Sequence, residues 1–100
     1  MKAIVTDANN RIALAVARSL GSRGIDIICV EQEQFSKKTP LCFYSKYCKK
    51  GYVLPNLHSA GDKFVAGILN IASNGDVLIP VSTGMVDFVS SQATELGKFI

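Results

Sequence analysis

The sequence predicts an α/β fold: a Rossmann-like open sheet of four parallel strands in the order 3-2-1-4, with helices on both faces. Short apolar runs alternate with longer segments whose apolar residues recur every three or four positions, which is typical of alternating strands and helices. The second run, at 25–30, is apolar almost throughout, as in a strand covered on both faces. Right-handed crossovers then place the first strand inside the sheet, beside the fourth.

The N-terminal part of the chain predicts a strand, a helix and a second strand. The apolar run at 3–5 ends in a polar turn, where Asn9 or Asn10 can cap a helix because its side-chain oxygen accepts bonds from unpaired N–H groups of the first turn. Gly21 and Gly24 supply flexible positions at which this helix ends. The expected buried stripe of the helix consists of Ile12, Ala13, Val16, Ala17 and Leu20.

The rest of the chain predicts two further strands, each followed by a helix. The third strand is expected at 51–54. Ser59, with Asp62 three residues later, is close to a capping box and predicts the start of a helix. The fourth strand is expected at 76–81, and the last helix from about Met85 to Leu96. In the helix that follows the third strand, the expected buried stripe consists of Phe64, Val65, Ile68, Leu69 and Ala72.

The composition indicates a single folded domain spanning residues 1–100. Hydrophobic residues make up 48% of the chain and charged residues 19%. No apolar run approaches the ~20 residues needed to cross a bilayer, so we expect no membrane partner. Three cysteines without Cys-x-x-Cys spacing and a single histidine argue against a metal site. Free thiols are typical of a reducing compartment and predict a cytoplasmic protein.

A basic segment lies between the second and third predicted strands. From Lys37 to Lys50 there are five lysines and no acidic residue, with three aromatic residues among them. Such a mixture can bind single-stranded nucleic acid, which makes a small nucleic-acid-binding module one alternative function. The net charge is only +3, and the rest of the chain has little positive excess. We therefore favour a solvated connection and no nucleic-acid partner.

Ligands of open α/β sheets bind outside the carboxyl ends of the strands, and polar residues follow three of the predicted strands. Backbone N–H groups together with Asn9, Asn10 and Arg11 can hold a carboxylate or a phosphate. The alternative is that both asparagines cap local structure and that Arg11 is solvated. The hydroxyl groups of Ser82 and Thr83, after the fourth strand, can likewise either contact a ligand or cap the following helix. The candidate ligand-binding residues are Asn9, Asn10, Arg11, Glu31, Ser82 and Thr83.

A dinucleotide site is a second alternative, which would make the chain the NAD(P)-binding Rossmann domain of an oxidoreductase. Glu31 stands where an acidic residue would contact a ribose. However, the turn after the first strand contains no glycine, and Asp7 would repel a pyrophosphate. The sequence also contains no evident nucleophile–base pair and no P-loop, so we expect no catalytic residues within the chain.

Several segments together resemble the N-terminal, pre-ATP-grasp domain of ATP-grasp ligases, in particular carbamoyl-phosphate-synthase large-subunit-like and carboxylate–amine ligase proteins. That group shows a T-D-(G/A)-N-S-like turn, A-R-S-L-G-x-x-G, S-(K/R)-Y with a later proline, and D-x-L-I-P. The resemblance covers nearly the whole chain in order. The segments are TDANNR at 6–11, AVARSLGSRG at 15–24, SKYC at 45–48 with LP at 54–55, and DVLIP at 76–80.

The resemblance implies that residues 1–100 precede an ATP-grasp module that follows residue 100 and holds ATP and magnesium. In such enzymes a small carboxylate is phosphorylated to an acyl phosphate, which an amine or ammonia then attacks. The N-terminal domain packs against that module and contacts substrate, without being catalytic itself. Members of the group often carry acidic residues after the I-P-x-S segment, whereas this chain has Thr83-Gly84-Met85-Val86.

The apolar C-terminal end predicts association. The last predicted helix carries Val86, Phe88 and Val89, and the sequence printed above ends at Phe99-Ile100. An ATP-grasp module would cover such residues. In its absence, we expect them to form an apolar patch through which the chain forms homo-oligomers.

Overall fold

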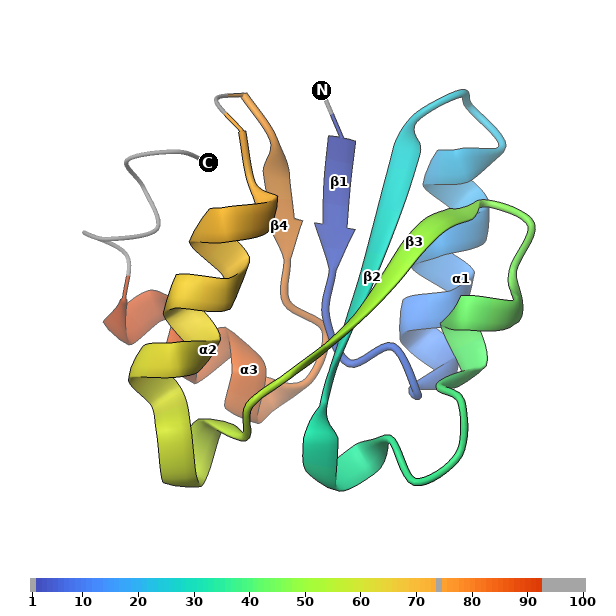
Figure 1. The fold of residues 1–100 in the computed structure, drawn as a ribbon. Helices are drawn as coiled ribbons and strands as arrows, with labels where there is room; N and C mark the ends of the chain where they lie inside the picture. The colour runs from blue at the N-terminus through green and yellow to red at the C-terminus, as the bar shows by residue number, and fades with distance from the viewer. Residues whose placement is uncertain (1, 74, 93–100) are drawn as a thin grey trace.

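The computed structural model describes residues 2–73 and 75–92. Its strands form one sheet in the order β3-β2-β1-β4, and every strand pair is parallel, which confirms the predicted fold class (Figure 1). The elements are β1 (Lys2–Val5), α1 (Arg11–Gly21), β2 (Asp26–Gln32), the 3-10 helices η1 (Glu33–Phe35) and η2 (Leu41–Tyr44), β3 (Cys48–Leu54), α2 (Leu57–Ile71), β4 (Val77–Ile79) and α3 (Thr83–Ser91).

β1 lies inside the sheet and pairs with a strand on each side. Ile4 is in register with Ile28 of β2 on one side and with Leu78 of β4 on the other. After β1 the chain passes through α1 to β2 on one side, and it returns later to form β4 on the other side. β1 and β4 therefore flank the topological switch point of the sheet, where open α/β sheets bind ligands.

The two faces of the sheet are covered by different helices, as predicted. Successive strand residues point to opposite faces, so Ile4 belongs to one buried cluster and Val5 to the other. The cluster of Ile4 includes Phe64 of α2 and Met85 of α3. The cluster of Val5 includes the alanines of α1. Figure 1 shows α1 on one side of the sheet and α2 with α3 on the other.

Helix α1 approaches the sheet through its small residues. Ala13 and Ala17 are fully buried, while Val16 and Leu20 pack partly against the same cluster. Ile12 is 63% exposed, so its place in the predicted stripe was wrong. Adjacent helix positions differ by about 100° in direction, and Ile12 therefore points away when Ala13 faces the sheet.

The third strand is longer than the sequence predicted. It begins at Cys48 rather than Gly51 and takes in the last two lysines of the basic segment. The pairing with β2 is irregular between Ile27 and Ile28, which accommodates the extra residue on β3. The preceding connection is ordered as well, because the Cys42 N–H donates to the carbonyl of Ala8 at 2.8 Å. The connection thus includes η2 in addition to irregular chain.

Helix α2 begins earlier than predicted. Asn56 is its N-cap residue and Leu57 its first residue, whereas Ser59 lies inside the helix. The near-capping-box interpretation of Ser59 was therefore wrong. The backbone is non-helical at Ala60, one residue after the expected cap, so the first turn is set off by a kink. The predicted stripe below the kink is confirmed, since Phe64, Val65 and Ile68 are buried.

The last helix also begins earlier than Met85, because Ser82 is the N-cap residue of α3. Phe88 and Val89 are half-buried against the core, and Val86 is 42% exposed. Within the described part of α3, Val86 is thus the large apolar side chain left for association. The predicted continuation to Leu96 and the pair Phe99-Ile100 lie outside the described residues.

A partly buried ion pair connects the start of β1 to the residue before β4. The Lys2 Nζ lies 2.6 Å from Asp76 Oδ2, and the Asp76 side chain is 3% exposed. The Ser73 N–H and the Lys2 N–H also donate to this carboxylate. Burial alone would raise the pKa of Asp76, but the hydrogen bonds from Lys2 and Ser73 and the Lys2 charge outweigh it and lower the pKa to about 2.

We expect this ion pair to make the free energy of unfolding depend on pH in the acidic range. The folded-state pKa lies below the ordinary value of 3.8, so the stabilisation is fully present above that value and is lost as the pH falls toward about 2. The loss should be about 2 kcal/mol of unfolding free energy, measured by urea titration at a series of pH values. Asp76→Asn should lack this component, and an identical pH slope in both proteins would contradict the assignment.

Candidate functional site

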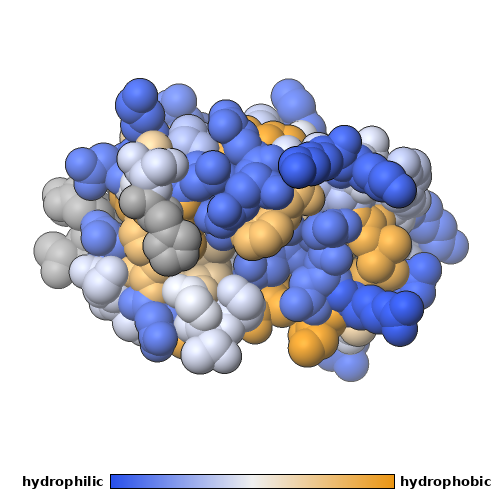
Figure 2. All heavy atoms as spheres, turned by 90° about the horizontal axis from the view of Figure 1, so that it is seen from below, coloured by the Kyte–Doolittle hydropathy of each residue, from blue (hydrophilic) through white to orange (hydrophobic). Residues whose placement is uncertain are grey.

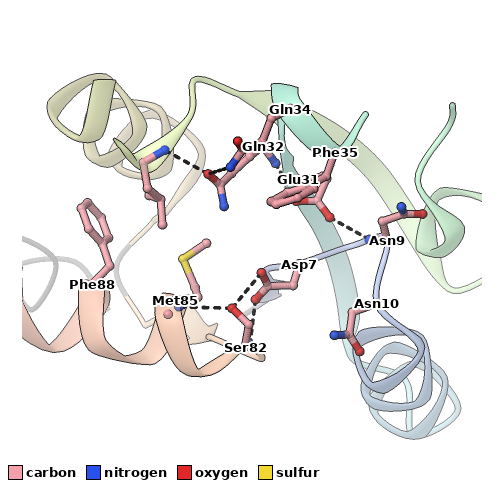
Figure 3. Close-up of a pocket in the computed structure, with 12 residues that line it drawn as sticks. Asp7, Asn9, Asn10, Glu31, Gln32, Gln34, Phe35, Ser82, Met85 and Phe88 are labelled. Atoms are coloured by element: carbon pink, nitrogen blue, oxygen red, sulfur yellow. Dashed lines mark hydrogen bonds between the residues drawn. The ribbon is translucent and has the colours of Figure 1, made fainter. Parts of the chain in front are cut away.

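A cavity of about 520 Å³ opens at the edge of the sheet where the strands have their carboxyl ends. Seen from this edge, apolar patches lie between hydrophilic side chains on the surface (Figure 2). The cavity is bordered by the turns after β1 and β4, the end of β2, and the first residues of α2 and α3 (Figure 3). It thus occupies the place at which open α/β sheets bind ligands, and its volume is within the usual range for small-molecule sites.

The cavity has an apolar wall and a polar wall. The apolar side chains come from η1, α2 and α3, and they are Phe35, Leu57, Met85 and Phe88. The polar side chains come mainly from the strand ends and the turns that follow them, and they include Asp7, Asn9, Asn10, Glu31, Gln32 and Ser82. Figure 3 shows Met85 and Phe88 on one side of the cavity and Phe35 on the other side, close to Glu31.

Asp7 links the two turns that flank the switch point. Its carboxylate accepts hydrogen bonds from the Thr6 hydroxyl, the Val81 N–H, the Ser82 N–H and the Ser82 hydroxyl, at 2.8, 3.3, 2.9 and 3.1 Å. The residue is 9% exposed and has a φ of 56°. A positive φ is unfavourable for most residues but tolerated by aspartate. Asp7 thereby fixes the N-terminus of α3, because Ser82 Oγ also accepts from the Met85 N–H.

Glu31 lies at the end of β2 and is 3% exposed. Its carboxylate accepts the Asn9 N–H at 2.9 Å and the Gln32 N–H at 2.7 Å. Burial raises the pKa of Glu31, and the negative charge of Asp7 raises it further, while the two backbone hydrogen bonds partly offset these effects. A carboxylate offers about four acceptor positions, so Glu31 retains capacity for a further donor.

Gln32 connects the cavity to the start of α2. Its Oε1 accepts the Leu57 N–H at 2.9 Å and the Gln34 side-chain amide at 3.2 Å. Asn56 Oδ1 in turn accepts the Gln34 N–H at 2.8 Å. These bonds hold η1 against the first turn of α2, which positions Phe35 at the rim and Leu57 in the wall.

The structure brings four of the six predicted site residues together at the cavity. Asn9, Asn10, Glu31 and Ser82 line it, whereas Arg11 and Thr83 are exposed first residues of α1 and α3 and do not. The side chains of all four also accept hydrogen bonds from backbone N–H groups, as described above for Glu31 and Ser82. Asn10 Oδ1 caps α1 by accepting the Ile12 N–H at 2.7 Å, and Asn9 Oδ1 accepts the Leu41 N–H at 3.2 Å.

Sequence reasoning missed several cavity residues. Asp7 was considered only as a charge that repels pyrophosphate, although its position directly after the first strand was a signal for a site residue. The residues of the apolar wall gave no such signal. Phe35, Leu57, Met85 and Phe88 come from three separate elements, and only the folded chain brings them to one cavity.

Comparison of the chain with protein-family models, with curated proteins and with solved structures finds no match. The site and the sequence motifs are therefore the observations that bear on function. Among the described residues, no helix combines the length and the apolar character needed to span a membrane. In the same part of the chain, no three His, Cys, Asp or Glu side chains gather in a way that could hold a metal ion.

The electrostatics of the cavity favour particular ligand chemistry. Its described lining contains the carboxylates of Asp7 and Glu31 and no lysine, arginine or histidine. A ligand that donates hydrogen bonds or carries positive charge would meet acceptors there. A carboxylate or phosphate would lose hydration and meet two negative charges, with compensation only from neutral donors.

Proposed function

We propose that residues 1–100 form the N-terminal, pre-ATP-grasp domain of an ATP-grasp ligase similar to the carbamoyl-phosphate synthase large subunit and the carboxylate–amine ligases. In this proposal the domain is not catalytic. The ATP-grasp module that packs against it holds ATP and magnesium and activates a small carboxylate as an acyl phosphate, which an amine or ammonia attacks. The domain contributes substrate contacts from the carboxyl edge of its sheet.

The observation that carries this proposal is the cavity at the switch point. It is formed by the same turns whose sequences resemble the ligase group, with Asp7 and Asn9 in the TDANNR segment and Ser82 directly after DVLIP and Val81. A segment used only to end a strand would not need to line a cavity of about 520 Å³. The coincidence of motif and cavity therefore supports a substrate-contacting role over a purely structural one.

The same geometry gives less support to the two alternatives. A dinucleotide would place its pyrophosphate next to Asp7, whose carboxylate already accepts the Ser82 N–H. A nucleic-acid-binding module would use the lysines of the basic segment. Three of these lysines already have partners within the chain. The Lys49 Nζ lies 3.3 Å from Asp26 Oδ1, and Lys46 and Lys50 lie over the rings of Tyr47 and Tyr52.

The test is ATP consumption by the natural protein in which these residues precede an ATP-grasp module. We expect ADP release that requires magnesium, a carboxylate and an amine or ammonia. The Glu31→Gln variant should raise the KM for one of the two non-nucleotide substrates about tenfold and leave the KM for ATP unchanged. The 100-residue chain alone should release no phosphate from ATP above background. Phosphate release by that chain, abolished by a mutation within it, would refute the proposal.

A further inference from the structure

The two walls of the cavity define what kind of molecule fits between them. We propose that the cavity takes a small amine with an apolar body, whose protonated nitrogen lies at Glu31 and whose body lies against Phe35 and Phe88. This inference rests on the proposed function, since it treats the cavity as the substrate-contacting site. It differs from the small carboxylate that the sequence led us to expect.

The charges that line the cavity favour a cationic ligand. The two carboxylates of the described lining face no cationic side chain there. Asp7 is largely occupied, because its two oxygens accept hydrogen bonds from Thr6, Val81 and Ser82. Glu31 accepts only two backbone N–H groups and keeps acceptor capacity. Glu31 is therefore the position at which a cationic nitrogen would gain most.

The buried environment of Glu31 also favours a cationic partner. A carboxylate that is 3% exposed has lost most of its hydration, which disfavours its charged form. The burial and the nearby Asp7 both raise the pKa of Glu31. A bound ammonium group relieves both effects at once, whereas a neutral hydroxyl relieves only the missing hydrogen bond. Charge-assisted hydrogen bonds are also about twice as strong as neutral ones.

The apolar side chains of the cavity favour a ligand with an apolar body. Phe35 is 50% exposed at the rim although it is a large aromatic residue, and Phe88 and Leu57 are only half-buried. All three side chains line the cavity, and the surface that they expose to it loses contact with water when an apolar group enters. A ligand made of polar groups alone, such as ammonia or a small sugar, would leave this wall uncovered. An aromatic or branched aliphatic body would cover it.

The experiment uses three matched probes that share a phenyl ring and a short chain: phenethylamine, 2-phenylethanol and 3-phenylpropionate. Each is titrated into the 15N-labelled chain, and Kd is taken from amide shifts of cavity residues. We expect phenethylamine to bind at least about tenfold more tightly than 3-phenylpropionate, with 2-phenylethanol between them. This comparison needs no variant. Equal or tighter binding of the carboxylate, or shifts away from the cavity, would overturn the proposal.

Variants then assign the two contacts. Glu31→Gln should weaken phenethylamine about tenfold while changing 2-phenylethanol less than about twofold. Asp62→Asn removes one negative charge from an exposed position of α2 outside this cavity and should change neither. Phe35→Ala should weaken all three probes. Unchanged amine binding in Glu31→Gln would remove the contact on which the proposal depends.

The result can be separated from that of the proposed function. Glu31-dependent amine binding by the chain, combined with no amine-dependent ADP release by the natural protein, would keep the specificity of the cavity and reject the ligase role. Amine-dependent ADP release combined with a cavity that prefers 3-phenylpropionate would keep the ligase role and reject the amine assignment.

Discussion

Asp7→Ala should destabilise the fold by about 3 to 5 kcal/mol, because it leaves the Ser82 N–H without its acceptor and removes one of the two acceptors of the Val81 N–H. The Thr6 hydroxyl and the Ser82 hydroxyl lose the same partner. In addition, alanine at a φ of 56° retains the backbone strain that aspartate tolerates. The loss should be visible as a lower midpoint in urea unfolding.

Asp7→Gly is the matched control. Glycine also removes the carboxylate but adopts a positive φ without a steric penalty, so this variant should be about 1 kcal/mol more stable than Asp7→Ala. The difference between the two variants isolates the backbone strain, and their shared loss isolates the hydrogen bonds. If Asp7→Ala unfolded at the same urea midpoint as the parent chain, the hydrogen bonds of Asp7 would contribute nothing to the free energy of unfolding.

Phe64→Ala should cost about 3 to 5 kcal/mol, since it removes the aromatic ring at the centre of the cluster between the sheet and α2. Phe64 is 2% exposed, and its ring meets that of Phe88 edge-to-face at a centroid distance of 5.9 Å. Phe35→Ala makes the same chemical change at a half-exposed position and should cost less than about 0.5 kcal/mol. Urea unfolding of both variants provides the comparison.

The edge-to-face contact can be measured separately. In a double-mutant cycle with Phe64→Leu and Phe88→Leu, we expect a coupling of about 1 kcal/mol. Because Phe88 also lines the cavity, Phe64→Leu should alter the amide shifts of Met85 and Phe88 in the folded protein. Strictly additive losses would mean that the two rings pack independently.

The sequence pattern and the right-handed crossover rule predicted the strand order and the helices on each face of the sheet. Several element boundaries, however, depend on tertiary contacts that the sequence pattern does not reveal. The extension of β3 to Cys48 runs through Lys49 and Lys50, which have low strand propensity and are tolerated because this edge of the sheet faces solvent. The sequence predicted that α2 starts at Ser59, whereas the structure has Asn56 as its N-cap residue. The bond from the Leu57 N–H to Gln32 favours the earlier start.

The polar part of the site was accessible to sequence reasoning because strand ends converge at a known edge of such sheets. Asn9 and Glu31 follow directly from that rule. The role of Asp7 does not, since its partners Val81 and Ser82 are far away in the sequence and meet it only when β1 and β4 pair. The apolar wall could not be predicted for the same reason, and the sequence placed Phe88 in an apolar patch for association and not in a cavity.

The position of β1 between neighbours from opposite ends of the chain also bears on the order of folding. β1 and β2 can pair after closing a short segment, whereas the hydrogen bonds that Ser82 donates to the Asp7 carboxylate close a loop of 75 residues. The entropic cost of closure grows with loop length, and long-range contacts therefore tend to form late. Contacts absent from the folding transition state change mainly the unfolding rate. The hydrogen bonds between the two turns should therefore slow the unfolding of the sheet more than they speed its folding. They thus determine mainly the lifetime of the folded cavity.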